Sequence, residues 1–209
     1  MRIVAGTFRG RPLVAPKGHS VRPTADRARQ AMFNILEHAA WSPGLQDARV
    51  TDLFAGSGSL GLEAISRGAA FCRFVEMDET ALGAIRANVA SLGAGDRVAI
   101  DRRDAARLSA RPTGGAPPFD IAFLDPPYGK GLGETTLGVL AAGGWLAEGA
   151  IVVLERGWRE TSDTPEGYEL LDERLWGAAR VSFLRFQGAE GAVAAAKTRA
   201  SASASSSSE

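Results

Sequence analysis

The sequence contains a single cysteine, two histidines and no long hydrophobic run. A lone cysteine, Cys72, excludes an internal disulfide, and the histidines have no cysteine partners, so we expect no metal site. The absence of an uncharged apolar stretch of about 20 residues argues against a transmembrane helix. The N-terminus also has no apolar core of a signal peptide. We therefore expect a cytoplasmic protein with no membrane partner.

The formal net charge is zero, but the charge is unevenly distributed. Residues 1–30 contain seven basic side chains against Asp26 alone, so the rest of the chain is acidic by six charges. A basic arm on an acidic body favours a partner that carries phosphates, although a solvated arm without a partner has the same composition. The residues that we expect to contact a nucleic acid are Arg9, Arg11, Lys17, Arg27 and Arg29.

Hydrophobic periodicity predicts strands that alternate with helices, an α/β fold with a mainly parallel sheet. Helices are expected over 24–40 (with Thr24 as N-cap), 59–67, 78–92 and 132–145, and strands over 49–54, 71–76, 97–101, 120–124, 150–155, 168–176 and 180–186. The last two strands are too close in sequence for a helical crossover, so we expect them to be antiparallel. We assign residues 1–40 to a basic arm and helix, 41–187 to the catalytic domain and 188–209 to a disordered tail.

A glycine-rich loop follows the first predicted strand. Residues 56–61 read Gly-Ser-Gly-Ser-Leu-Gly, the G-x-G-x-x-G pattern. Glycines let the backbone approach a ligand closely, and the helix that follows directs its free N–H groups toward it. The pattern alone is weak, because enzymes that bind NAD and enzymes that bind S-adenosylmethionine both use such a turn.

Acidic residues follow the next two predicted strands. An acid at the tip of the second strand can accept hydrogen bonds from both hydroxyls of a ribose. Glu76 is the better candidate, because Asp78 is needed as a helix cap. After the third strand, Asp104 can accept from the amino group of an adenine, cap a helix, or do both.

The most informative segment is Asp125-Pro126-Pro127-Tyr128, which follows the fourth predicted strand. A carboxylate can accept from an amino group, two prolines form a stiff turn with free carbonyls, and a tyrosine ring can stack on a planar base. The segment therefore describes a cradle for the exocyclic amine of an aromatic base. Methyl transfer to an amine needs such a cradle, whereas hydride transfer does not.

With these motifs, the chain resembles the amino-methyltransferases of the class I S-adenosylmethionine fold. More narrowly, it resembles the bacterial RsmD-type family that methylates the N2 amine of a guanine in 16S ribosomal RNA. The narrowest marker is residues 22–29, which read Arg-Pro-Thr-Ala-Asp-Arg-Ala-Arg. The resemblance covers about Ile3 to Phe186; the Ala/Ser-rich tail departs from it.

The resemblance implies a seven-stranded Rossmann-like sheet whose last strand is antiparallel, and S-adenosylmethionine as methyl donor. It also implies 16S ribosomal RNA or the assembling 30S subunit as partner. Nothing in the sequence demands more than a monomer, which is the state that we expect. Asp125, Pro126, Pro127 and Tyr128 become the expected catalytic segment. The residues expected to bind the cofactor are Arg22, Thr24, Asp52, Phe54, Ala55, Gly56, Ser57, Gly58, Glu76, Met77, Asp104, Ala105 and Asp125.

Three other interpretations remain open at this point. An amino-methyltransferase that acts on another RNA or on DNA would use the same chemistry, and the charge of the arm cannot distinguish these polymers. An NAD-dependent oxidoreductase would account for the glycine loop and Glu76 but would leave residues 125–128 without a role. A non-catalytic RNA-binding protein is disfavoured by the intact glycine loop and the complete Asp-Pro-Pro-Tyr segment.

Overall fold

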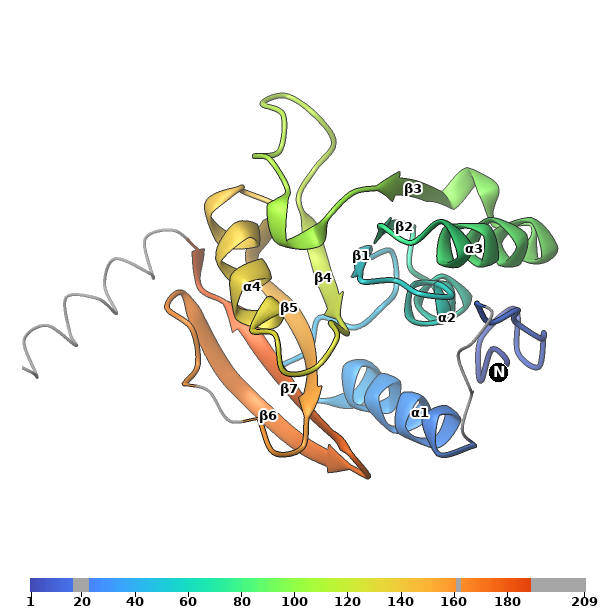
Figure 1. The fold of residues 1–209 in the computed structure, drawn as a ribbon, viewed down its shortest axis with the longest axis horizontal. Coiled ribbons are helices and arrows are strands. Elements are labelled where there is room, and N and C mark those ends of the chain that lie inside the picture. The colour runs from blue at the N-terminus through green and yellow to red at the C-terminus, as the bar shows by residue number, and fades with distance from the viewer. Residues whose placement is uncertain (17–22, 161–162, 189–209) are drawn as a thin grey trace, which may run out of the picture.

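The computed structural model describes residues 1–16, 23–160 and 163–188 (Figure 1). Its α-helices are α1 (Pro23–His38), α2 (Ser59–Ser66), α3 (Glu79–Leu92) and α4 (Leu132–Ala142), and its 3-10 turns are η1 (Gly95–Arg97) and η2 (Ala105–Arg107). Its strands are β1 (Arg49–Leu53), β2 (Phe71–Glu76), β3 (Val98–Arg102), β4 (Phe119–Leu124), β5 (Leu146–Gly157), β6 (Tyr168–Trp176) and β7 (Ala179–Phe186). None of the helices in these ranges is long and apolar enough to span a membrane.

The strands form one seven-stranded sheet in the order β3-β2-β1-β4-β5-β7-β6. β7 is antiparallel to both of its neighbours and the other pairs are parallel, which confirms the predicted fold class. Figure 1 shows α1, α2 and α3 grouped away from α4. Because side chains alternate across a strand, the sheet contributes to two cores. Val50, Phe74 and Phe123 face the group around α1, whereas Leu53 and Leu124 share a cluster with α4.

The predicted elements are all present, and their ends differ for physical reasons. α1 begins at Pro23, so Thr24 lies inside the first turn and is not the N-cap; proline is favoured at a first helical position because its missing N–H has no intrahelical partner there. β1 ends at Leu53, because Phe54 turns away with a φ of 63°. α4 ends at Ala142, before Gly143 and Gly144, and not at the predicted position 145. β5 begins at Leu146, earlier than the predicted position 150. The tail, predicted to be disordered, lies outside the described residues from position 189.

The N-terminal arm is docked on the domain by α2. The buried carboxylate of Glu63 accepts hydrogen bonds from the amides of Val4 (2.7 Å) and Ala5 (3.0 Å). Ser66 donates its hydroxyl to the carbonyl of Ala5 (2.5 Å). A Cβ at Gly6 would lie 1.9 Å from the carbonyl oxygen of Ser66, so only glycine permits this approach. The arm is therefore irregular, as predicted, but it is held in place.

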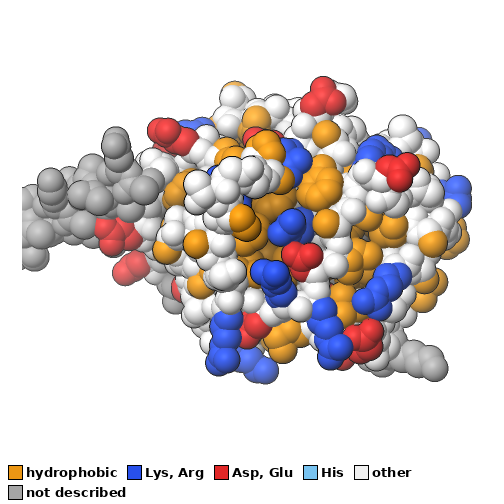
Figure 2. All heavy atoms as spheres, turned by 90° about the horizontal axis from the view of Figure 1, so that it is seen from above, with side chains coloured by type: hydrophobic (Ala, Val, Ile, Leu, Met, Phe, Trp, Pro, Cys, Tyr) orange, Lys and Arg blue, Asp and Glu red, His pale blue; other side chains and the backbone are white. Residues whose placement is uncertain are grey.

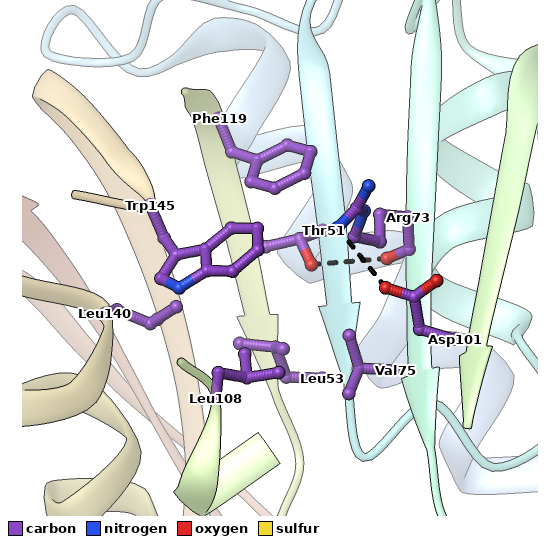
Figure 3. A pocket seen from close by; sticks show the side chains of 9 residues that line it. All are labelled: Thr51, Leu53, Arg73, Val75, Asp101, Leu108, Phe119, Leu140 and Trp145. Atoms are coloured by element: carbon purple, nitrogen blue, oxygen red, sulfur yellow. Dashed lines mark hydrogen bonds and ion pairs between the residues drawn. The ribbon is translucent and has the colours of Figure 1, made fainter. Parts of the chain in front are cut away.

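The sheet face that packs against α4 contains a small gap near β2 and β3 (Figure 3). Arg73 crosses this face to pair with Asp101 (3.2 Å), and Phe119 stacks on Trp145 with 6.3 Å between ring centroids. The gap has no room for a water molecule. We therefore assign no ligand to this gap.

Figure 2 views the molecule from above the orientation of Figure 1. On the face that it shows, hydrophobic, basic and acidic side chains are intermixed.

Candidate active site

Three neighbouring strands end at the same level, and their loops form the candidate site. β1 lies between β2 and β4, and Leu53 is in register with both Val75 and Leu124. The next residues along the chain, Phe54, Glu76 and Asp125, therefore lie side by side where the three strands end, with Glu76 as the last residue of β2. This is the carboxyl edge at which parallel α/β sheets bind their ligands. The structure thus brings together the three loops singled out in the sequence.

Asp52 shapes the glycine loop from inside the protein. Its side chain is buried, and Oδ2 accepts a hydrogen bond from the amide of Gly61 in the first turn of α2 (2.9 Å). Burial raises the pKa of Asp52 well above its ordinary value, and the charges of Asp125 and Glu76 raise it further. Asp52 therefore holds the glycine loop in shape from below, and a direct contact between its side chain and a cofactor stays a prediction.

Glycines are required at specific points of this loop. Gly56 and Gly58 have φ angles of 55° and 75°, in the left-handed region of backbone conformation that residues other than glycine rarely adopt. A Cβ at Gly56 would meet no atom within 4 Å, so the loop faces open space there. A Cβ at Gly61 would lie 2.4 Å from both Cys72 Sγ and Phe74, so glycine permits α2 to pack closely on β2. The outward side of the loop is consequently free for a ligand.

Glu76 links the glycine loop to the start of α3. Its Oε2 accepts from the amide of Gly56 (2.8 Å), and its Oε1 accepts from the amides of Met77 (2.7 Å) and Asp78 (2.9 Å). Asp78 caps α3 by accepting from Ala81 (2.8 Å), which confirms its predicted role. The carboxylate of Glu76 retains lone pairs that can accept from ribose hydroxyls, so the ribose assignment stays a prediction.

The other residues predicted to bind the cofactor differ in how far they are exposed to solvent. The Met77 side chain is 56% exposed, which leaves it available to cover a planar ring. Asp104 caps the η2 turn by accepting from Ala106 (3.0 Å), so its capping role is confirmed, and it lies half-buried. Ala55, Ser57 and Ala105 are buried, and their contacts with a cofactor stay predictions. Arg22 lies outside the described residues.

Asp125 follows β4 and retains solvent exposure at the site, although protein atoms crowd it on most sides. This crowding, together with the charge of Glu155, raises the pKa of Asp125 from 3.8 to about 7. The direction follows from two like charges near one another in a partly desolvated recess. Asp125 can therefore exchange between its charged and neutral forms near neutral pH.

The loop after Asp125 is anchored to the end of β5 by two glutamates that the sequence did not identify. The Tyr128 hydroxyl donates to Glu155 Oε1 (2.5 Å), and the amide of Gly129 donates to Glu160 Oε1 (2.9 Å). The Tyr128 ring also packs on Gly157, where a Cβ would approach the ring to 3.3 Å. The only signal in the sequence was that a fifth strand ends near position 155, at the same edge as the other loops.

The predicted nucleic-acid contacts divide into exposed and buried residues. Arg9 and Arg27 are exposed, and Arg11 is exposed while donating to the carbonyl of Ser91 (2.5 Å). Arg29 is buried, with its guanidinium bonded to the Arg2 carbonyl and to Asp26, so it faces the arm and not the solvent, and its contact with a nucleic acid stays a prediction. The periodicity of α1 explains this, because Arg29 lies on the helix face that packs against the arm. Lys17 lies outside the described residues.

Comparison with known protein families finds one model that matches residues 1–185, described as "Conserved hypothetical protein 95". Among curated proteins, Ribosomal RNA small subunit methyltransferase D of Escherichia coli strain K12 is 37% identical over 188 residues, which cover 90% of this chain and 89% of that protein. The protein of the same name from Haemophilus influenzae is 34% identical over 187 residues, with 90% and 93% covered.

Solved structures give the same picture at the level of the fold. A structure described as a putative methyltransferase yhhF from Escherichia coli has a TM-score of 0.74 at 32% identity and covers 90% of this chain and 98% of its own. A putative methylase HI0767 from Haemophilus influenzae has a TM-score of 0.73 at 30% identity, with 89% and 98% covered. Both comparisons extend over nearly all of the described chain.

Proposed function

Since the chain belongs to the family described as Conserved hypothetical protein 95, we propose that it transfers a methyl group from S-adenosylmethionine to the N2 amine of a guanine in 16S ribosomal RNA. Curated relatives that cover 90% of the chain are named methyltransferases of small-subunit ribosomal RNA, and the chain is an enzyme of that kind. The base, its N2 position and the methyl donor are the parts of the proposal that need experiments.

One observation carries the choice of cofactor: the edge where β1, β2 and β4 end is acidic. The charges of Glu76 and Asp125 both act on Asp52, which places the three carboxyl groups within electrostatic range of each other. Such an edge attracts the cationic sulfonium of S-adenosylmethionine and repels the pyrophosphate of NAD. The acidic edge therefore favours methyl transfer over hydride transfer.

The residues at this edge fit S-adenosylmethionine. The outward side of Gly56 is open to a ligand, and Met77 is exposed next to Glu76 in the chain. Glu76 would accept from the ribose, and Asp104, which follows β3, would accept from the adenine amine. When bound, S-adenosylmethionine supplies an electrophilic methyl group on sulfur. Arg22 and Thr24 stay candidates for the same ligand by resemblance alone.

The Asp-Pro-Pro-Tyr loop would hold the target base. A guanine must leave its stack to reach a recessed site, and Tyr128 offers a ring on which it can stack. Asp125 and the Pro126 carbonyl would each accept a hydrogen bond from the N2 amine, with the rigid Pro126-Pro127 step fixing their spacing. Two acceptors hold the amine so that its lone pair points at the methyl group, and alignment of reactants lowers the barrier by several kcal/mol. The amine loses its extra proton after transfer.

The proposal is tested by methyl transfer from tritiated S-adenosylmethionine to unmethylated small subunits, to naked 16S ribosomal RNA and to duplex DNA. We expect label only in ribosomal RNA, and nuclease digestion of that RNA to yield N2-methylguanosine. Label in DNA, or in a different nucleoside, would contradict the proposed substrate. Isothermal calorimetry should show binding of S-adenosylhomocysteine and none of NADH.

The raised pKa of Asp125 predicts how the rate depends on pH. The charged form accepts from the amine, so kcat/KM should rise with pH and level off above the pKa of about 7. Glu155→Gln removes the negative charge that raises this pKa, so the rise should move to lower pH. Initial rates from about pH 5 to about pH 9 measure both effects. If kcat/KM of Glu155→Gln rises at the same pH as that of the wild type, the electrostatic coupling between Asp125 and Glu155 is contradicted.

Two substitutions of Tyr128 should differ in their effect on KM for RNA. Tyr128→Ala removes the stacking face and should raise KM for RNA by roughly tenfold to a hundredfold, since stacking of a base on an aromatic ring contributes about 1–3 kcal/mol. Tyr128→Phe keeps the ring and loses only the bond to Glu155, so KM should change by a few-fold at most. Steady-state kinetics on both variants separates the ring from the hydroxyl; an equal loss in both would contradict stacking.

A further inference from the structure

A recess of about 360 Å³ lies between the N-terminal arm and α1, apart from the three strand-end loops. Arg2 and Val4 of the arm line one side of it, and one face of α1 from Asp26 to Asn34 lines the other. Its volume falls within the range of small-ligand sites, which is about 300–1,000 Å³. The recess is therefore large enough to hold part of a substrate.

Buried Arg29 fixes the two walls of the recess relative to each other. Its guanidinium donates to the carbonyl of Arg2 (2.5 Å) on one wall and to Asp26 (2.9 Å) on the other. It also lies 3.8 Å from the carboxylate of Glu63, which holds the amides of the arm. These contacts form the recess before a ligand arrives, and they neutralise the charge of Asp26.

Two cations at the recess are available to an anion. Arg2 and Arg27 are both exposed, and within the described ranges neither guanidinium makes a hydrogen bond or an ion pair. With Asp26 paired to Arg29, the lining has an excess of positive charge. Guanidinium groups bind phosphate through two parallel hydrogen bonds, so this rim suits a phosphodiester.

The helix wall also presents a hydrogen-bonding edge. Gln30 donates from Nε2 to Oδ1 of Asn34 (2.7 Å), which fixes both amides one helical turn apart. This bond leaves Oε1 of Gln30 as an acceptor and Nδ2 of Asn34 as a donor, the combination that reads a base edge. The apolar side chains of Val4 and Ala31 line the same recess and can contact the face of a base.

We propose that this recess binds a nucleotide of the RNA substrate other than the target guanine. Its phosphate would lie on Arg2 and Arg27, and its base edge would bond to Gln30 and Asn34. The inference rests on the proposed function, because it takes the substrate to be RNA. Recognition of a second nucleotide would let the enzyme select one site among many guanines, since phosphate contacts position the RNA and base contacts specify it.

Filter binding of transcribed 16S ribosomal RNA over a range of salt concentrations tests the two halves of the recess separately. The double variant Arg2→Ala/Arg27→Ala should weaken binding about tenfold and reduce the slope of log Kd against log salt by about 1.4, since each phosphate contact on a single strand contributes about 0.7. Gln30→Ala/Asn34→Ala should weaken binding about tenfold with the slope unchanged. Arg174→Ala, an exposed arginine on β6, is the matched control and should bind as the wild type does.

Each outcome has a separate meaning. Binding of S-adenosylhomocysteine should be unchanged in every variant, which shows that they fold. If the wild type methylates ribosomal RNA and both double variants bind it normally, the recess proposal is overturned and the proposed function stands. If the variants bind naked RNA normally but methylate small subunits poorly, the recess contacts a ribosomal protein and the nucleotide proposal is wrong. If the wild type methylates no RNA, the proposed function itself fails.

Discussion

Asp125→Asn should reduce kcat for RNA methylation by at least about a hundredfold, the scale on which removal of one group that stabilises transition-state charge acts. The substitution keeps the size of the side chain and removes its charge. In the mechanism that we propose, that charge faces an amine that becomes positive as the methyl group arrives. The amide nitrogen of asparagine can also present a donor where an acceptor is needed. Single-turnover methylation with saturating cofactor measures the effect.

Two controls separate a chemical defect from a folding defect. The carboxyl of Asp125 has a higher pKa in the folded chain, about 7, than its ordinary value of 3.8, so stability falls as pH rises through that interval. Asp125→Asn removes this penalty, and its melting temperature at pH values above 7 should equal or exceed that of the wild type. Asp96→Asn, an exposed carboxylate in η1, should leave kcat unchanged. Near-normal turnover by Asp125→Asn would refute the proposed role.

Glu63→Ala should lower the free energy of unfolding by about 3–5 kcal/mol, because it removes a buried carboxylate that two buried guanidinium groups and two backbone amides share. Arg67 keeps its pair with Glu37 and Arg29 its pair with Asp26, but the buried nitrogen atoms that face Glu63 lose their acceptor. Glu63 is fully buried and accepts from Arg67 Nε (2.8 Å) as well as from the amides of Val4 and Ala5. The side chains of Arg67 and Arg29 are only 2% and 5% exposed, so water cannot replace the lost carboxylate. Urea denaturation followed by circular dichroism measures the change.

The matched control is Glu79→Ala on α3. Glu79 pairs with Arg86 (3.2 Å) and Arg102 (3.0 Å), and all three side chains are more than half exposed. Exposed pairs contribute about 0–1 kcal/mol, so this loss should be small. Glu63→Ala should also free the arm, which makes residues 1–16 more sensitive to protease than in Glu79→Ala. Equal denaturation midpoints for the two variants would contradict the assignment of Glu63 as the anchor of the arm.

The sequence predicted most of the fold because its signals are local. The short, mostly apolar run of residues 71–76 and the helical spacing behind Asp78 reflect neighbours a few residues apart, and both elements appear where expected. The glycine loop and residues 125–128 were placed together by a general rule for parallel sheets, and the register of β1 with β2 and β4 bears this out.

By itself, the sequence determined the alternation of strands and helices and the three loops at one edge, and it predicted a base-binding role for Asp-Pro-Pro-Tyr. Only the tertiary structure decided which charged residues face the solvent. Arg29 and Asp52 carry the same formal charges as their exposed neighbours, yet both are buried by partners far along the chain. The amide of Val4 meets Glu63 across 59 positions, and Tyr128 meets Glu155 across 27. Such contacts depend on how elements pack, which composition and local periodicity do not encode.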